Sequence, residues 1–141
     1  MADVRGAVDA LKKMDDRELA TYLASTRIGL GAAMVLFPGL MHRLWVGTSD
    51  PPGKAIMRSL GARDAVLGFG TLTAIKRGRP TRGWLEASAA ADAADALGTI
   101  LSWGKLPFLS RWMVLLSAGS SAAVHASLAR NELTLVDELT P

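Results

Sequence analysis

The sequence contains no cysteine, and its only histidines are His42 and His125. Without cysteine, the chain can form no disulfide, no thiolate metal site and no cysteine nucleophile. A zinc site would need both histidines together with carboxylates, and these residues do not have the spacing of metal ligands. A nucleotide-binding glycine loop and a Ser-His-Asp pattern are also missing. We therefore expect neither a metal ion nor any other cofactor.

A continuous basic face is missing as well. The net charge of +3 would suit a nucleic-acid-binding protein, but the Lys and Arg residues stand beside apolar segments and form no single patch. We therefore expect no nucleic-acid partner. Hydrophobic residues make up 50% of the 141-residue chain, and the mean hydropathy of +0.24 is high for a soluble domain. These values favour an integral membrane protein.

Four apolar segments follow one another along the chain, at residues 19–41, 55–75, 84–103 and 106–128. Each approaches the ~20 residues that cross a hydrocarbon core. We predict an all-α fold, a four-transmembrane-helix bundle over residues 19–128. Residues 1–18 predict a short amphipathic N-terminal helix, lying on the membrane surface or capping the bundle. Residues 129–141 form a polar C-terminal tail.

Small residues occupy one side of the first two segments. Gly29 and Gly31 lie in the first segment, and Gly61 and Gly68 share a face of the second. Such surfaces allow close contact between helices, within one chain or between copies. We therefore hypothesise that copies of the chain associate into a homo-oligomer.

Basic residues outside the four segments divide unequally between the two ends of the predicted bundle. One end carries most of them: Arg5, Lys12, Lys13, Arg17, Lys76, Arg77, Arg79, Arg82 and Arg130. The other end has mainly Arg43, Lys54 and Lys105 and gathers three tryptophans, Trp45, Trp103 and Trp112. The positive-inside rule then predicts residence in the inner (cytoplasmic) membrane with both termini in the cytoplasm.

A soluble four-helix bundle is the alternative. The third segment favours it, because this segment is rich in alanine and carries three acids. A soluble bundle would, however, show a charged outer face on every helix. The first and fourth segments have almost no charged residues, so we prefer the membrane interpretation.

Five ionisable residues fall within the apolar segments: Arg27, Arg63, Asp64, Asp92 and Asp95. Asp92 and Asp95 share one helical face with Ser88 and Thr99, and they are the pair that we expect to hold one proton between them. In one interpretation the arginines pair with the acids and fix helix register. In the other, Asp64, Asp92 or Asp95 lacks a cation and transfers a proton, while Arg27 and Arg63 bind a ligand.

The fourth segment has a narrow polar stripe of Ser117, Ser121 and His125. We assign Ser117 and Ser121 to ligand binding. His125 is interpreted as a satisfied polar residue near the inner end of its helix, and direct contact with Asp92 or Asp95 is not expected.

The segment RSLGARDAVLG, followed by a basic loop and an alanine-rich helix with Asp92 and Asp95, resembles small four-helix membrane proteins of actinobacteria. These proteins are grouped as DUF4267-like or, more distantly, DoxX-like. The resemblance covers residues 19–128 and implies a four-span membrane fold. It implies no particular activity.

The sequence is compatible with two functions. The first is a non-catalytic accessory or ligand-binding protein, whose partner is a membrane lipid or an apolar small molecule. The second is a cofactor-free isomerase or cyclase that uses intramembrane Asp residues for proton transfer on an apolar substrate.

Overall fold

The computed structural model describes residues 14–139, and the side chains of residues 14–132. Its elements are α2 (Asp16–Leu36), α3 (Pro38–Val46), α4 (Pro51–Lys76), α5 (Arg82–Leu101), the single 3-10 turn η1 (Trp103–Lys105) and α6 (Phe108–Leu139). Over this range the chain contains helices and no strand. Most of the amphipathic helix predicted for residues 1–18 lies outside the described residues. Helix α6 continues into the segment that the sequence assigns to a polar tail.

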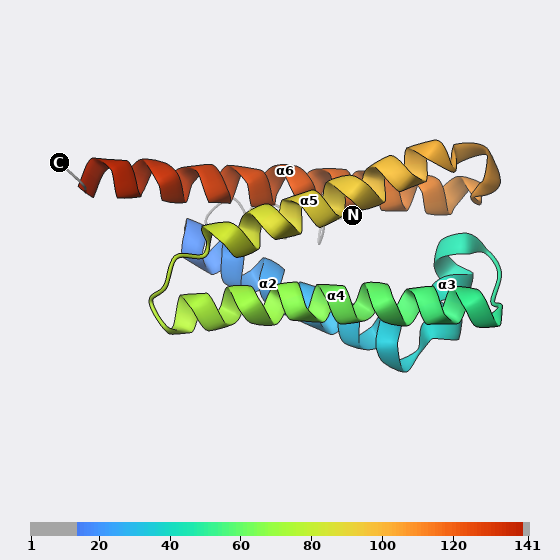
Figure 1. Cartoon of the computed structure of the whole chain (residues 1–141). Helices are drawn as coiled ribbons and strands as arrows, with labels where there is room; N and C mark the ends of the chain where they lie inside the picture. The colour runs from blue at the N-terminus through green and yellow to red at the C-terminus, as the bar shows by residue number, and fades with distance from the viewer. Residues whose placement is uncertain (1–13, 140–141) are drawn as a thin grey trace, which may run out of the picture.

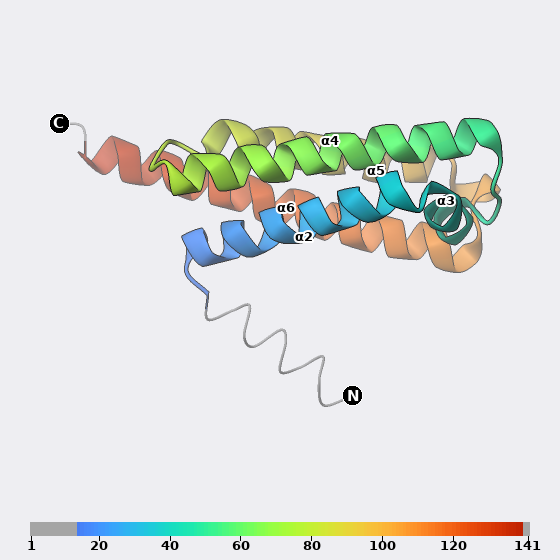
Figure 2. The ribbon, with the colours of Figure 1, turned by 90° about the horizontal axis from the view of Figure 1, so that it is seen from below.

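The helices form two antiparallel pairs that face each other. Helix α2 packs mainly on α4, and α5 packs mainly on α6, as Figure 1 shows. One end of the bundle holds the start of α2, the α4–α5 loop and the far end of α6. The opposite end holds the short helix α3, the start of α4 and η1, in the view of Figure 1 and in the turned view of Figure 2.

The first predicted segment consists of two helices. Helix α2 begins after Asp15, whose side chain accepts a hydrogen bond from the backbone N–H of Glu18 at 2.7 Å, as part of a capping box. It ends at Leu36, and Pro38 starts α3. Proline suits the first position of a helix because that position needs no backbone N–H donor. Pro38 therefore separates two helices, and α3 folds over the end of the bundle.

Glycines bring α2 and α4 into backbone contact. A Cβ atom on Gly31 would lie 2.5 Å from the carbonyl oxygen of Gly61, and one on Gly68 would lie 2.6 Å from that of Ala24. These distances leave no room for a side chain. The small faces of the two segments are thus used within one chain, so Gly31, Gly61 and Gly68 are not available for a contact between copies.

Large apolar side chains lie on the outside of the bundle. Leu101, Phe108 and Leu109 are each at least 70% exposed, and many other Leu, Ile, Val and Phe side chains are exposed too. The buried polar and charged residues include Arg27, Asp64, Thr71, Ser88, Asp92, Thr99 and His125. A soluble protein has the opposite distribution, since it buries large apolar residues and exposes charges.

The prediction of four transmembrane helices is wrong. Among the described residues, only α2 and the Phe108–Glu132 part of α6 are long and apolar enough to cross a membrane. Helix α4 carries Arg63 and Asp64, α5 carries Asp92 and Asp95, and both are rich in glycine or alanine. The sequence interpretation counted all four segments as spans because of their length and their few charged residues. Glycine and alanine suit helix contact, but their side chains contribute little hydropathy.

Candidate functional site

A charged cluster of Arg27, Arg63, Asp64, Asp92 and Asp95 lies between the two helix pairs. Arg27 comes from α2, Arg63 and Asp64 from α4, and the other two from α5. The structure thus brings together all five ionisable residues that the sequence singles out. Two guanidinium groups face three carboxylates, so the cluster has one negative charge in excess when all five groups are ionised.

The Arg27 guanidinium is the buried centre of the cluster. Its Nη1 donates to Asp92 Oδ2 at 3.1 Å and its Nη2 to Asp92 Oδ1 at 2.5 Å. The same Nη2 lies 3.3 Å from Asp64 Oδ1. Paired planar contacts of this kind are the strongest geometry for an ion pair. Because the side chains of Arg27, Asp64 and Asp92 are all less than 10% exposed, water hardly screens this half of the cluster.

Arg63 forms the second half, nearer the surface. Its Nη1 and Nη2 donate to the two oxygens of Asp95 at 3.1 and 2.7 Å. The side chains of this pair are 31% and 29% exposed. Arg63 also donates to Asp64 Oδ1, from Nε at 3.2 Å and from Nη2 at 3.1 Å. Asp64 therefore links the two halves, since it contacts both arginines.

Asp92 and Asp95 do not form the proton-sharing pair that the sequence predicts. Each carboxylate faces a different arginine instead of the other carboxylate. The two other polar residues of that helical face, Ser88 and Thr99, make no hydrogen bond to the described acid side chains. The Thr99 hydroxyl donates to the backbone oxygen of Asp95 at 2.8 Å. The buried Ser88 hydroxyl has no hydrogen-bond partner among the described residues.

Helix α6 contributes Ser121 and His125 to the site. The Ser121 hydroxyl donates to Asp92 Oδ2 at 2.7 Å. His125 Nδ1 lies 2.8 Å from the backbone oxygen of Ser121 and 3.5 Å from Asp92 Oδ2. Because a carbonyl oxygen only accepts, the first contact requires a hydrogen on Nδ1. The expectation that His125 would not reach Asp92 is wrong. His125 lies four residues after Ser121 on the same face, and this spacing was the available signal.

A cavity of about 210 Å³, the charged cavity, opens onto the cluster. Its lining includes the predicted residues Arg27, Asp64, Asp92, Asp95, Ser117 and Ser121, together with His125. Arg63 does not line this cavity, but it lines a neighbouring hollow that Asp64 and Asp95 also line. The Ser117 hydroxyl itself donates to the backbone oxygen of Val114 at 3.2 Å.

A second, larger cavity of about 580 Å³, the apolar cavity, lies beside the first between α3 and α6. Its walls include Met41, Leu44, Met113 and Leu116. Leu30, Trp45 and Ser117 line both cavities, so the two spaces adjoin. No local sequence pattern identifies Leu30 and Trp45 as lining residues, because their position depends on how α3 folds back beside α6. Ser110 fixes this arrangement by donating a hydrogen bond to the backbone oxygen of Trp45.

Comparison of the chain with protein-family models, with curated proteins and with solved structures finds no match. The resemblance to DUF4267-like proteins therefore stays a prediction. Within the described part of the chain, no three His, Asp or Glu residues are grouped so as to hold a metal ion. The charged cluster and its two cavities are the features of the described residues that indicate a function.

Proposed function

We propose that this chain is a small membrane protein that binds an amphipathic molecule without chemical conversion. The observation that carries the proposal is the junction of the two cavities. The apolar cavity would hold the hydrocarbon part of the ligand, and the charged cavity would hold its polar head beside Asp92, Asp95 and Ser121. Such a division, with few polar groups at one end of an apolar pocket, is typical of small-molecule sites.

The net charge of the cluster indicates which kind of head group the site prefers. The cluster carries one more carboxylate than guanidinium groups. An ionised head group entering the charged cavity loses most of its hydration, so it needs an opposite charge nearby. A cationic amine restores neutrality, whereas an anionic head adds to the excess. We therefore infer a preference for an amphiphile with a cationic or hydrogen-bond-donating head.

Membrane residence is part of the proposal, with α2 and α6 as the crossing helices. Only 28% and 22% of their apolar stretches are buried inside the bundle, which distinguishes them from the core helices of a soluble protein. Lys76, Arg77, Arg79 and Arg82 lie at one end of the bundle, and the edge-to-face pair Trp103 and Trp112 lies at the other. The positive-inside rule assigns the basic end, and with it both termini, to the cytoplasm of an inner membrane.

The catalytic alternative, a cofactor-free isomerase or cyclase, ranks second. It needs a carboxylate that is free to exchange a proton. Asp64, Asp92 and Asp95 each face a guanidinium group. Ser121 donates its hydrogen bond to Asp92, and this carboxylate is a weak general base because it also faces Arg27. These contacts favour binding over turnover.

The test compares three probes with the same chain length, octylamine, octanol and octanoate, on protein purified in dodecyl maltoside. The thermal midpoint of unfolding should rise most with octylamine, less with octanol and least with octanoate, because binding to the folded state stabilises it. Equal shifts with octylamine and octanoate would contradict the proposed site.

A matched pair of variants locates the binding. Ser117→Leu fills the junction of the cavities and should remove the octylamine shift. Ser127→Leu makes the same change at an exposed position of α6, outside both cavities, and should keep the shift. If both variants lose it equally, the ligand does not bind at the junction.

A further inference from the structure

A separate groove of about 520 Å³ lies between α4 and α5, on the side of the α4–α5 loop. Val66, Phe69 and Trp84 form apolar parts of its wall, and Arg77 and Arg79 lie at its end. It shares no lining residue with the charged cavity or the apolar cavity. Whatever binds here therefore contacts a different surface from the ligand proposed above.

The apolar wall follows one face of α4 and ends at a positive charge. Val66, Phe69, Thr73 and Arg77 are spaced three or four residues apart, so they follow one another along that face, and Gly70 lies four residues after Val66. Val66 and Phe69 are 59% and 58% exposed. No side chain fits at position 70, because a Cβ atom on Gly70 would lie 2.3 Å from the Trp84 ring. The absent side chain lets the Trp84 ring lie directly on α4 and close one side of the groove.

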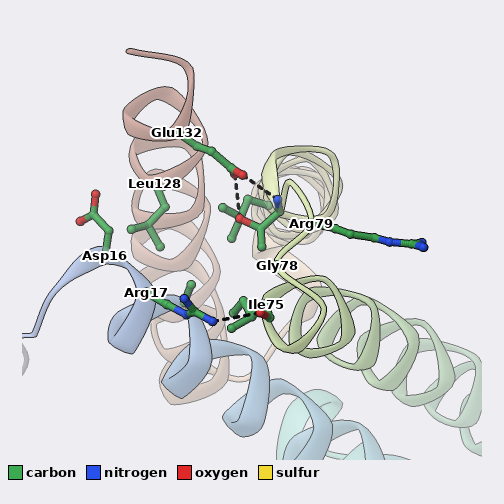
Figure 3. Close-up of a pocket in the computed structure, with 10 residues that line it drawn as sticks. Asp16, Arg17, Ile75, Gly78, Arg79, Leu128 and Glu132 are labelled. Carbon is green, nitrogen blue, oxygen red and sulfur yellow. Dashed lines mark hydrogen bonds between the residues drawn. The ribbon is translucent and has the colours of Figure 1, made fainter. Parts of the chain in front are cut away.

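The two arginines at the end of the groove have no acidic partner among the described residues. Other basic side chains nearby are engaged: Arg17 donates to the backbone oxygen of Ile75 at 3.0 Å, and Arg82 pairs with Glu86 at 2.7 Å. Figure 3 shows the neighbouring pocket, where Glu132 receives hydrogen bonds from Thr81 and the Arg79 side chain points away from Asp16 and Glu132. Arg77 and Arg79 thus carry two positive charges that no described side chain neutralises.

The turn after α4 keeps the second arginine beside the groove. Gly78 adopts a left-handed conformation with φ of 59°, which a residue with a side chain rarely adopts. The backbone N–H of Arg79 then donates to the carbonyl oxygen of Ala74 at 2.9 Å. This bond folds the loop back on the last turn of α4 and holds Arg79 near Arg77.

We propose that this groove binds an anionic phospholipid, with an acyl chain along Val66, Phe69 and Trp84 and the phosphate between Arg77 and Arg79. Guanidinium groups suit phosphate because they donate paired hydrogen bonds. From Val66 to Arg77 the helix rises about 16 Å, at ~1.5 Å per residue. That length matches one leaflet, which is half of a hydrocarbon core of ~30 Å. The apolar wall of this length favours a phospholipid over a free phosphate ion.

The experiment measures lipid binding to the full chain by native mass spectrometry in a neutral detergent. Phosphatidylglycerol should bind more tightly than phosphatidylcholine of the same acyl chains. The double variant Arg77→Gln/Arg79→Gln should bind phosphatidylglycerol about 30-fold more weakly, from ~1 kcal/mol per basic residue. Circular dichroism and the thermal midpoint verify that the variant keeps its fold, which we expect because both side chains are exposed.

The matched control removes two basic residues from the opposite end of the bundle, Arg43→Gln/Lys54→Gln, and should leave phosphatidylglycerol affinity unchanged. A loss as large as that of the Arg77/Arg79 variant would mean that net charge decides binding, and would overturn the proposal. Equal affinity for phosphatidylcholine would overturn it too. Displacement of phosphatidylglycerol by millimolar inorganic phosphate would identify a site for free phosphate instead of a lipid. Failure of this site leaves the octylamine test unaffected, since the two surfaces share no residue.

Discussion

The two Arg–Asp pairs of the charged cluster have the same two-bond geometry and different surroundings. The Arg27 and Asp92 side chains are 7% and 9% exposed, whereas those of Arg63 and Asp95 are 31% and 29% exposed. A buried pair is costly to break, because removing one partner strands the other charge away from water. A partly exposed pair is screened and is cheaper to rearrange. We infer that Arg27–Asp92 sets the register of α2 against α5, and that Asp95 remains accessible to a ligand.

The largest effect should come from Arg27→Met. It leaves Asp92 buried with Ser121 and His125 as its remaining partners, and should lower the free energy of unfolding by roughly 3–5 kcal/mol. Chemical unfolding in detergent, followed by circular dichroism, measures the loss. The double variant Arg27→Met/Asp92→Leu should recover most of it, because an apolar pair can replace a buried ion pair. A double variant as unstable as the single one would argue against the register role.

A smaller loss is expected for Ser121→Ala. The Ser121 hydroxyl donates to the buried Asp92 carboxylate at 2.7 Å, and a hydrogen bond to a charged group contributes about 1.5–3 kcal/mol. Ser127→Ala is the matched control, since this exposed hydroxyl donates only to the backbone oxygen of Val124. The same unfolding measurement should show almost no change for the control. Equal losses in the two variants would contradict the contribution of Ser121.

Asp95→Asn should have the smallest effect on stability, about 1 kcal/mol or less. The pair is partly exposed, and Arg63 keeps its contacts with Asp64. If the free energy of unfolding fell as far as in Arg27→Met, the two halves of the cluster would contribute equally to stability. This result would contradict the distinction between the buried pair and the partly exposed pair.

The sequence predicted which charged residues lie together better than it predicted which arginine faces which acid. Charged residues in apolar segments are costly unless they meet, so Arg27, Arg63 and the three acids could be expected in one place. Which arginine meets which acid depends on the rotation and depth of four helices, and no local pattern fixes these. The prediction that Asp92 and Asp95 share a proton rested only on their spacing along one helix. The arginines of α2 and α4 separate them.

The sequence predicted neither the number of candidate membrane-spanning helices nor the apolar cavity, for different reasons. All four segments are long enough to cross a bilayer, but this length led to the wrong count of four, because α4 and α5 are not apolar enough. The apolar cavity exists because Pro38 starts a new helix that places Trp45 against α6. A proline near the end of an apolar segment indicates a break, but it does not say where the next helix goes.

The most direct test of the account is the octylamine shift of Asp95→Asn, measured against the wild type in dodecyl maltoside. Asp95 lines the charged cavity, and its pair with Arg63 is the accessible half of the cluster. The amide keeps the size of the side chain and removes its charge, so the variant should unfold at nearly the wild-type temperature while losing most of the octylamine-induced rise. A variant that keeps both its stability and the full octylamine shift would contradict the claim that the accessible half of the charged cluster binds the head of the ligand.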